Sequence, residues 1–161
     1  MKNNRKLLAI HLNEFNYEYL KFGAKKYDFK YLKKFIQLKK ISTYTKDKIQ
    51  NKNLDPWVQS VSIISGKISK NHKVFNLGQQ LPKNLINIWD VLTKNKINCW
   101  IWGPMNSNYK KNNFLKLFFP DPWNYRVLPY PRDLEYLYFL PRYYAKNYLD
   151  LKKSNIIKFT L

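Results

Sequence analysis

The residues most able to do chemistry lie at the start of a short helix that the sequence predicts. Asp55 can cap a helix with its side-chain oxygens, and Pro56 suits the first turn of that helix. Gly66 is a residue at which such a helix commonly ends. A helix start favours negative charge, because its free N–H groups and its dipole face a ligand there. The pattern therefore predicts either an anion site at Pro56, Trp57 and Gln59 or a plain structural helix.

Two further segments place polar residues directly after an apolar run. Residues 7–12 are followed by Asn13 and Glu14, and residues 97–102 are followed by a turn that contains Asn106. In open α/β sheets, ligands bind just past the carboxyl ends of the strands. We therefore expect strands over both ranges, in one mainly parallel sheet, with the polar residues at its edge.

Other reactive side chains have structural explanations that compete with functional ones. His11 lies inside an apolar run, and a lone histidine rarely binds metal without partners. His72 follows the helix and can lock a turn by hydrogen bonding, while Asp121 lies between two prolines in what reads as a rigid turn. Cys99 is the only cysteine, so no disulfide within the chain is possible, and its apolar strand predicts a buried, inert thiol.

The spacing of apolar residues predicts the elements that must position these side chains. The expected helices cover residues 17–21, 31–38, 56–66, 86–94 and 132–150, and the expected strands cover 7–12, 40–44 and 97–102. A charged loop is expected over 45–53 and an irregular connection over 67–84. Alternating helices and strands predict an α/β layered sandwich, with a mainly parallel sheet and helices on both faces, as a single domain over 1–161.

In this order, the segments resemble the N-terminal part of the alkaline phosphatase superfamily, which includes phosphodiesterases, nucleotide pyrophosphatases and sulfatases. The resemblance covers residues 6 to 125, and the chain looks most like a divergent bacterial branch of the superfamily. The motifs that carry it are Asn13-Glu14, the helix that ends at Ser65-Gly66, His72, Asn76, Trp102-Gly103-Pro104 and Pro120-Asp121-Pro122-Trp123. It implies a hydrolase of phosphate or sulfate esters that uses a divalent metal such as zinc. By resemblance, Glu14 or Asn13 would hold the metal, the start of the helix at Pro56 would bind the anionic ester, and Asn106 would contact its oxygens.

The chain departs from the superfamily pattern in its catalytic groups. The nucleophile position falls at about Pro56 or Trp57, and neither side chain can attack phosphorus. No histidine follows His72, so the metal ligands that the superfamily takes from its C-terminal half are absent. We therefore expect an incomplete version of a larger domain, inactive alone, that lacks its C-terminal half or a partner chain. The alternative is a non-catalytic protein that is structural or binds polyanions.

The charge of the chain bears on that alternative. Thirty Lys and Arg residues against ten Asp and Glu give a net charge of +20, which attracts polyanions. Only four of the thirty are Arg, the residue that nucleic-acid readers favour, so compositional bias explains the charge better than nucleic-acid binding does. The apolar run over 7–12 is too short for a signal peptide or a membrane span, so we expect a cytoplasmic protein.

Overall fold

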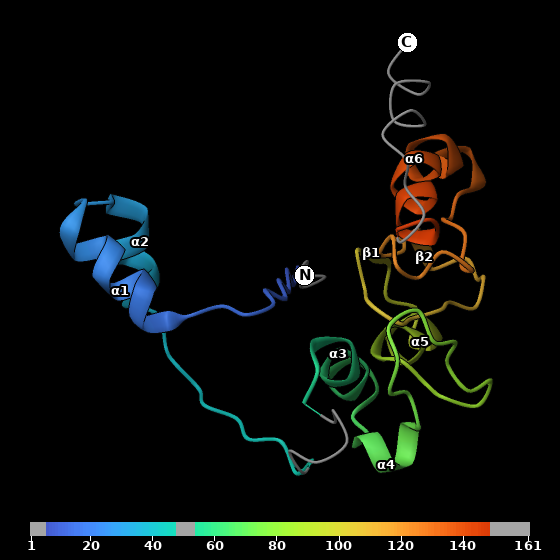
Figure 1. Cartoon of the computed structure of the whole chain (residues 1–161), viewed down its shortest axis with the longest axis horizontal. Helices are drawn as coiled ribbons and strands as arrows, with labels where there is room; N and C mark the ends of the chain where they lie inside the picture. Colours follow the sequence, from blue (N-terminus) through green and yellow to red (C-terminus); the bar gives the residue numbers. More distant parts are fainter. Residues whose placement is uncertain (1–5, 48–53, 149–161) are drawn as a thin grey trace, which may run out of the picture. The chain divides into compact units, whose positions relative to one another are not determined.

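The first part of the chain folds as a pair of helices, α1 (Tyr17–Lys26) and α2 (Lys30–Ile36). The computed structural model describes residues 6–47 and 54–148, and it divides the chain into two units, Met1–Tyr44 and Thr45–Leu161 (Figure 1). The helix α1 begins where it does because the side chain of Asn16 accepts hydrogen bonds from the N–H groups of Glu18 and Tyr19, at 3.0 and 3.1 Å. Ala24 is completely buried in this unit, whereas most of the unit's other side chains are exposed.

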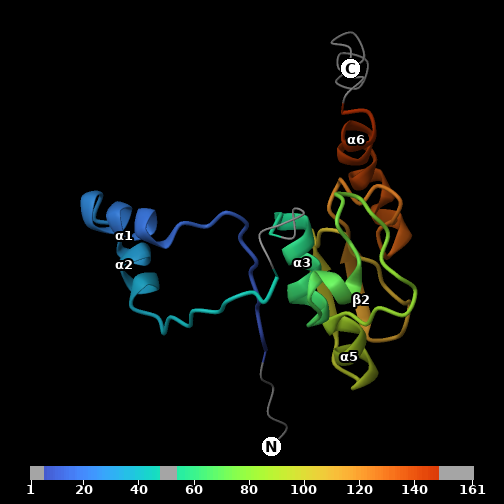
Figure 2. The ribbon, with the colours of Figure 1, turned by 60° about the horizontal axis from the view of Figure 1, so that its bottom comes forward.

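The second unit combines helices with a parallel pair of strands, so the predicted α/β class is confirmed. Strand β1 (Cys99–Trp102) pairs in parallel with β2 (Leu115–Phe119). Figure 2 shows β2 together with helices of this unit. The other elements are the helices α3 (Pro56–Ser65), α4 (Ser69–His72), α5 (Ile88–Lys94) and α6 (Glu135–Lys146), with a short 3₁₀ helix, η2 (Arg132–Leu134), before α6.

The core of the second unit joins the sheet to α5. Trp89 of α5 meets Phe118 of β2 edge-on, with ring centroids 5.7 Å apart, and Cys99 and Leu115 are buried beside them. Burial raises the pKa of the Cys99 thiol, which keeps it protonated and unreactive, in line with the inert thiol expected from its apolar strand. A second cluster of buried residues lies under α3 and consists of Val61, Val74 and Leu81.

The structure corrects several element predictions. All five predicted helices contain a helix, although residues 149–150 of the last one lie outside the described residues, and β1 lies within the predicted strand 97–102. The strands predicted over 7–12 and 40–44 are wrong, since neither range is assigned to a strand and both are largely exposed. Apolar residues alone do not make a strand, because its hydrogen bonds come from a partner elsewhere in the chain. The sequence analysis also missed β2 and the short helix α4.

Among the described residues, no helix combines the length and the apolar character that a bilayer crossing requires. The single domain predicted over 1–161 stays a prediction beside the two units that the structure shows.

The residue after α4 gives a stability prediction. Lys73 adopts a left-handed conformation with φ of +56°, which costs an L-residue about 1–2 kcal/mol relative to the right-handed region. Glycine avoids that cost but loses more freedom on folding, so Lys73→Gly is expected to raise the free energy of unfolding by about 0.5–1 kcal/mol. Lys70→Gly, inside α4, should instead lower it by about 1 kcal/mol. Urea unfolding of both variants checks this, and a destabilised Lys73→Gly protein would contradict it.

Candidate functional site

Helix α3 begins and ends where the sequence predicts, but the predicted cap by the side chain of Asp55 is wrong. Pro56 is the first helical residue, and the backbone carbonyl of Asp55 accepts hydrogen bonds from the N–H groups of Val58 and Gln59, at 2.9 and 3.0 Å. The side chain of Asp55 makes no capping hydrogen bond. The helix ends at Gly66, whose φ of +65° is the left-handed conformation that favours glycine at this position.

A carboxylate from outside α3 lies against this helix. Asp47 accepts hydrogen bonds at Oδ1 from the N–H and the hydroxyl of Ser69, at 3.0 and 2.7 Å. Its Oδ2 accepts a hydrogen bond from Nε2 of Gln59 at 3.1 Å. Partial burial acts to raise the pKa of the Asp47 carboxyl, but the hydrogen bonds from Ser69 and Gln59 outweigh burial and hold that pKa below its usual value. Asp47 is therefore an anion that ties α4 to α3.

A buried histidine completes this cluster. His72 is completely buried, and its Nε2 lies 3.1 Å from the hydroxyl oxygen of Ser62 on α3. The N–H of Val74 donates to Nδ1 of His72 at 3.1 Å. Since Nδ1 accepts a hydrogen bond, the proton of the neutral ring is on Nε2, which donates to Ser62. Burial lowers the pKa of His72, and the charge of Asp47 offsets only part of that effect.

The cluster contains Ser, His and Asp but lacks the arrangement of a hydrolytic triad. In a triad, an unprotonated Nε2 takes the proton of the serine hydroxyl, and the acid holds the Nδ1–H on the far side of the ring. Here Nε2 of His72 carries the proton, and Asp47 lies on the side of Ser62, with its Oδ2 3.4 Å from the serine hydroxyl oxygen. The arrangement does not activate Ser62 as a nucleophile, and it clamps α3 to α4.

His72 also locks the turn after α4, as the sequence analysis considered. The ring does so by accepting a hydrogen bond from the N–H of Val74, two residues further along the chain.

Asn106 holds three segments together behind the start of α3. Its Oδ1 accepts a hydrogen bond from the N–H of Gly78 at 2.7 Å, and its Nδ2 donates to the carbonyl of Asn76 at 2.9 Å and to that of Trp57 at 3.5 Å. Asn106 is 1% exposed, so no solvent replaces these contacts. A Cβ on Gly78 would lie 2.8 Å from the carbonyl oxygen of Trp123, so this junction also requires the glycine.

The structure brings some of the predicted site residues together. Trp57 and Asn106 are in contact, and the indole N–H of Trp57 donates to the carbonyl of Phe75 at 3.0 Å. Pro56 and Gln59 lie on the same first turns of α3, with the amide of Gln59 on Asp47. The amide of Asn106 is engaged with backbone at both its oxygen and its nitrogen, so its contact in the structure is with the protein itself.

The predicted metal ligands belong to the first unit. Asn13 and Glu14 form an exposed turn, with a φ of +53° at Glu14. Within residues 6–47 and 54–148, no three His, Cys, Asp or Glu side chains come close enough together to hold a metal ion. Asn13 and Glu14 stay predictions as ligands, and the described residues supply no set of partners for them.

Sequence reasoning missed Asp47, Ser62 and Ser69 as parts of the site. Asp47 lies in the range predicted as a charged loop, and its contact with Ser69 spans 22 residues, which no local pattern signals. Ser62 and His72 meet because the turn between α3 and α4 brings the two helices together.

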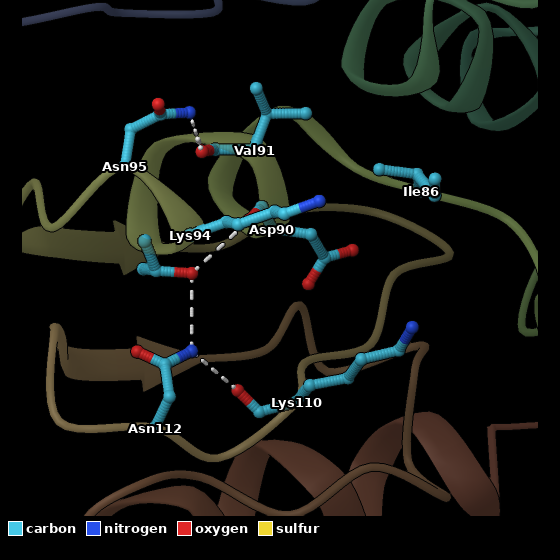
Figure 3. Close-up of a pocket in the computed structure, with 8 residues that line it drawn as sticks. Ile86, Asp90, Val91, Lys94, Asn95, Lys110 and Asn112 are labelled. Carbon is cyan, nitrogen blue, oxygen red and sulfur yellow. Dashed lines mark hydrogen bonds between the residues drawn. The ribbon is translucent and has the colours of Figure 1, made fainter.

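A hollow of about 750 Å³ lies beside α5 and the loop that carries Lys110 and Asn112 (Figure 3). The side-chain amide of Asn112 donates to the hydroxyl of Thr93 and to the carbonyl of Lys110, both at 3.1 Å. Val91, on the rim, is half exposed. Because the amide is engaged within the protein and the rim is open to solvent, we assign no ligand to this hollow.

Comparisons of the chain with protein-family models, with curated proteins and with solved structures give no match. Its relation to the alkaline phosphatase superfamily is therefore a proposal that rests on the sequence resemblance and on the geometry above.

Proposed function

We propose that the chain is the N-terminal portion of an alkaline-phosphatase-like hydrolase domain, which binds a small anionic ester or phosphate at the start of α3. One observation supports this most: Asn106 joins the first turn of α3 to the turn at 76–78. These are segments of the resemblance, and Asn106 itself follows the carboxyl end of β1. Ligands of α/β sheets bind at that end of the strands.

The local charges explain why this portion alone would be a poor catalyst. Two carboxylates, those of Asp55 and Asp47, accompany the start of α3, and both repel an anionic ester unless a cation neutralises them. Asn13 and Glu14 would contribute to a divalent-metal site, and a C-terminal half or a partner chain would supply the remaining ligands. A cytoplasmic location is part of the same proposal.

The first test of the proposed function is a combined metal and turnover measurement. We expect the purified chain to hydrolyse aryl phosphate monoesters, diesters and sulfates no faster than a control with buffer and metal alone, because no hydroxyl occupies the expected nucleophile position. Elemental analysis after incubation with zinc should show fewer than two tightly held ions per chain. Two bound zinc ions, with turnover that a chelator abolishes, would show that the chain is a complete enzyme.

Anion binding at α3 can be followed separately, by titrating the labelled chain with inorganic phosphate at constant ionic strength. The backbone amide signals of Trp57 and Val58 should shift, since they lie in the first turn of α3. Asp55→Asn should bind phosphate more tightly than the parent, because it removes a repulsive charge, whereas Asp133→Asn, on exposed η2, should leave binding unchanged. Unshifted α3 amides would remove the anion site from the proposal.

The alternative is a non-catalytic protein that binds polyanions, which the net charge of +20 favours. Binding of polyphosphate that weakens steeply with salt and leaves the α3 amides unshifted would support this alternative.

A further inference from the structure

The helix pair of the first unit carries exposed aromatic side chains beside lysines. Tyr19 and Phe22 of α1 are 75% and 56% exposed, and Tyr27 and Phe29, between the two helices, are 56% and 53% exposed. With Lys26 they form what we call the aromatic–lysine patch: Tyr19, Phe22, Lys26, Tyr27 and Phe29. Tyr19, Phe22 and Lys26 recur at helical spacing, so they share one face of α1.

This face points away from the contact between the two helices. The buried residue of α1 is Ala24, and Tyr17 and Leu20 are half buried on its side of the helix. On α2, Leu32 and Ile36 are half buried, and the hydroxyl of Tyr17 donates to the carbonyl of Ile36 at 3.1 Å. The helix α1 therefore uses one side for α2 and presents aromatic residues on its other side.

The charge around the patch is strongly positive. Residues 17–40 contain eight lysines, no arginine and only two acidic residues, Glu18 and Asp28. Both acids are paired with lysines of the same unit, Glu18 with Lys21 and Asp28 with Lys33. The surplus of lysines makes this surface complementary to a dense array of negative charges.

The arrangement of the rings distinguishes between two kinds of anionic partner. The ammonium group of Lys26 lies 5.4 Å from the ring centroid of Phe22 and 5.2 Å from that of Tyr27. Tyr27 and Phe29 lie against each other, with ring centroids 5.7 Å apart. Nucleic-acid bases stack on open ring faces, whereas these faces are partly covered. Aromatic and lysine side chains of this kind suit the headgroup level of a bilayer, where rings insert and lysines attract anionic lipids.

We propose that the aromatic–lysine patch docks the protein on the surface of an anionic lipid bilayer, with α1 lying in the plane of that surface. Phe22 and Phe29 enter the boundary between headgroups and acyl chains, and Lys25 and Lys26 lie over the lipid phosphates. This role is independent of the proposed anion site on α3, because it uses residues of the first unit alone.

Co-sedimentation of the full chain with vesicles tests the proposal. Vesicles of phosphatidylcholine mixed with phosphatidylserine should bind the chain, and vesicles of phosphatidylcholine alone should bind it far more weakly. The double variant Lys25→Gln with Lys26→Gln should bind the mixed vesicles about thirtyfold more weakly, since each lysine near such a surface contributes about a factor of five to the affinity. A double variant with the same loss of charge elsewhere, Lys70→Gln with Lys116→Gln, should weaken binding much less.

A second pair of variants tests the rings. Phe22→Ala with Phe29→Ala should weaken vesicle binding at least tenfold, whereas Ile63→Ala with Tyr136→Ala, two exposed residues of the second unit, should not change it. Circular dichroism confirms that the helices remain. The proposal is overturned if a control double variant loses as much vesicle binding as the double variant it is compared with, or if the mixed vesicles do not bind the chain. Tighter binding of single-stranded DNA through the same rings would also overturn it.

Discussion

Replacing Asn106 with alanine is expected to lower the free energy of unfolding by about 3–4 kcal/mol, one of the two largest effects that the structure predicts. The substitution leaves the N–H of Gly78 and the carbonyl of Asn76 without their hydrogen-bond partner in a buried place, and it weakens the link to Trp57. Asn106 also has a φ of +41°, which alanine tolerates less well than asparagine. Denaturant unfolding, followed by tryptophan fluorescence, measures the loss.

Two matched variants separate the causes. Asn106→Gly removes the backbone strain but not the lost hydrogen bonds, so it should recover no more than about 1 kcal/mol. Asn113→Ala, at an exposed asparagine in the loop before β2, should stay within about 0.5 kcal/mol of the parent. If Asn106→Ala costs less than about 1 kcal/mol, the junction of the three segments is not a rigid part of the fold, and the main support for the proposed function is lost.

Some helices and strands could be predicted from the sequence because nearby residues determine them, and others could not. The helix α3 could be predicted because its bounds are set locally: Pro56 suits the first helical turn, and Gly66 adopts the left-handed conformation that ends the helix. The strand β1 could be predicted from its apolar run. In contrast, the strand over 7–12 was predicted from the same kind of run and is not a strand, because pairing is decided by the rest of the chain.

In the candidate site, too, the features set by nearby residues could be predicted, and those set by distant residues could not. The polar residues at the start of α3 and after β1 could be found from their position, and the contact of Asn106 with Trp57 follows the expectation that these segments converge. The role of Asp47 could not be found, because it depends on the placement of a loop carboxylate against Ser69 and Gln59. Sequence patterns locate side chains on elements, whereas hydrogen bonds between distant segments decide whether a polar group binds a ligand or holds the fold.

Lowering the pH is expected to destabilise the second unit through His72. Burial lowers the pKa of this residue in the folded protein below its ordinary value of 6.5, so the unfolded chain binds the proton more readily. The stabilising contribution of neutral His72 is therefore complete above pH 6.5 and is lost as the pH falls from there through the lower folded value. Protonation also removes the acceptor of the Val74 N–H and brings a positive charge into a completely buried place.

The carboxyl of Asp47 adds a second loss in the same direction at lower pH. Its folded pKa is below the ordinary value of 3.8, so its contribution is present above that pH and is lost below it. Between pH 7 and 5, His72 is therefore the group of this cluster whose titration changes stability, and its effect cannot exceed about 1.4 kcal/mol per pH unit for one proton.

Urea unfolding of three proteins between pH 8 and 5 isolates that effect. In His72→Asn, the amide oxygen can replace Nδ1 as acceptor of the Val74 N–H, but the side chain does not titrate. This variant should be less stable than the parent at pH 8, yet should lose less stability on acidification. Asn113→Ala, whose exposed side chain does not titrate, is the third protein and should keep the slope of the parent. Asp121, whose pKa burial raises, is present in all three proteins, so its titration cancels in the comparison.

If the parent and His72→Asn have equal slopes, His72 does not titrate in this range, and the clamp between α3 and α4 is insensitive to acid. A steeper slope in the parent would show that protonation of His72, which removes the acceptor of the Val74 N–H, weakens the fold around α4.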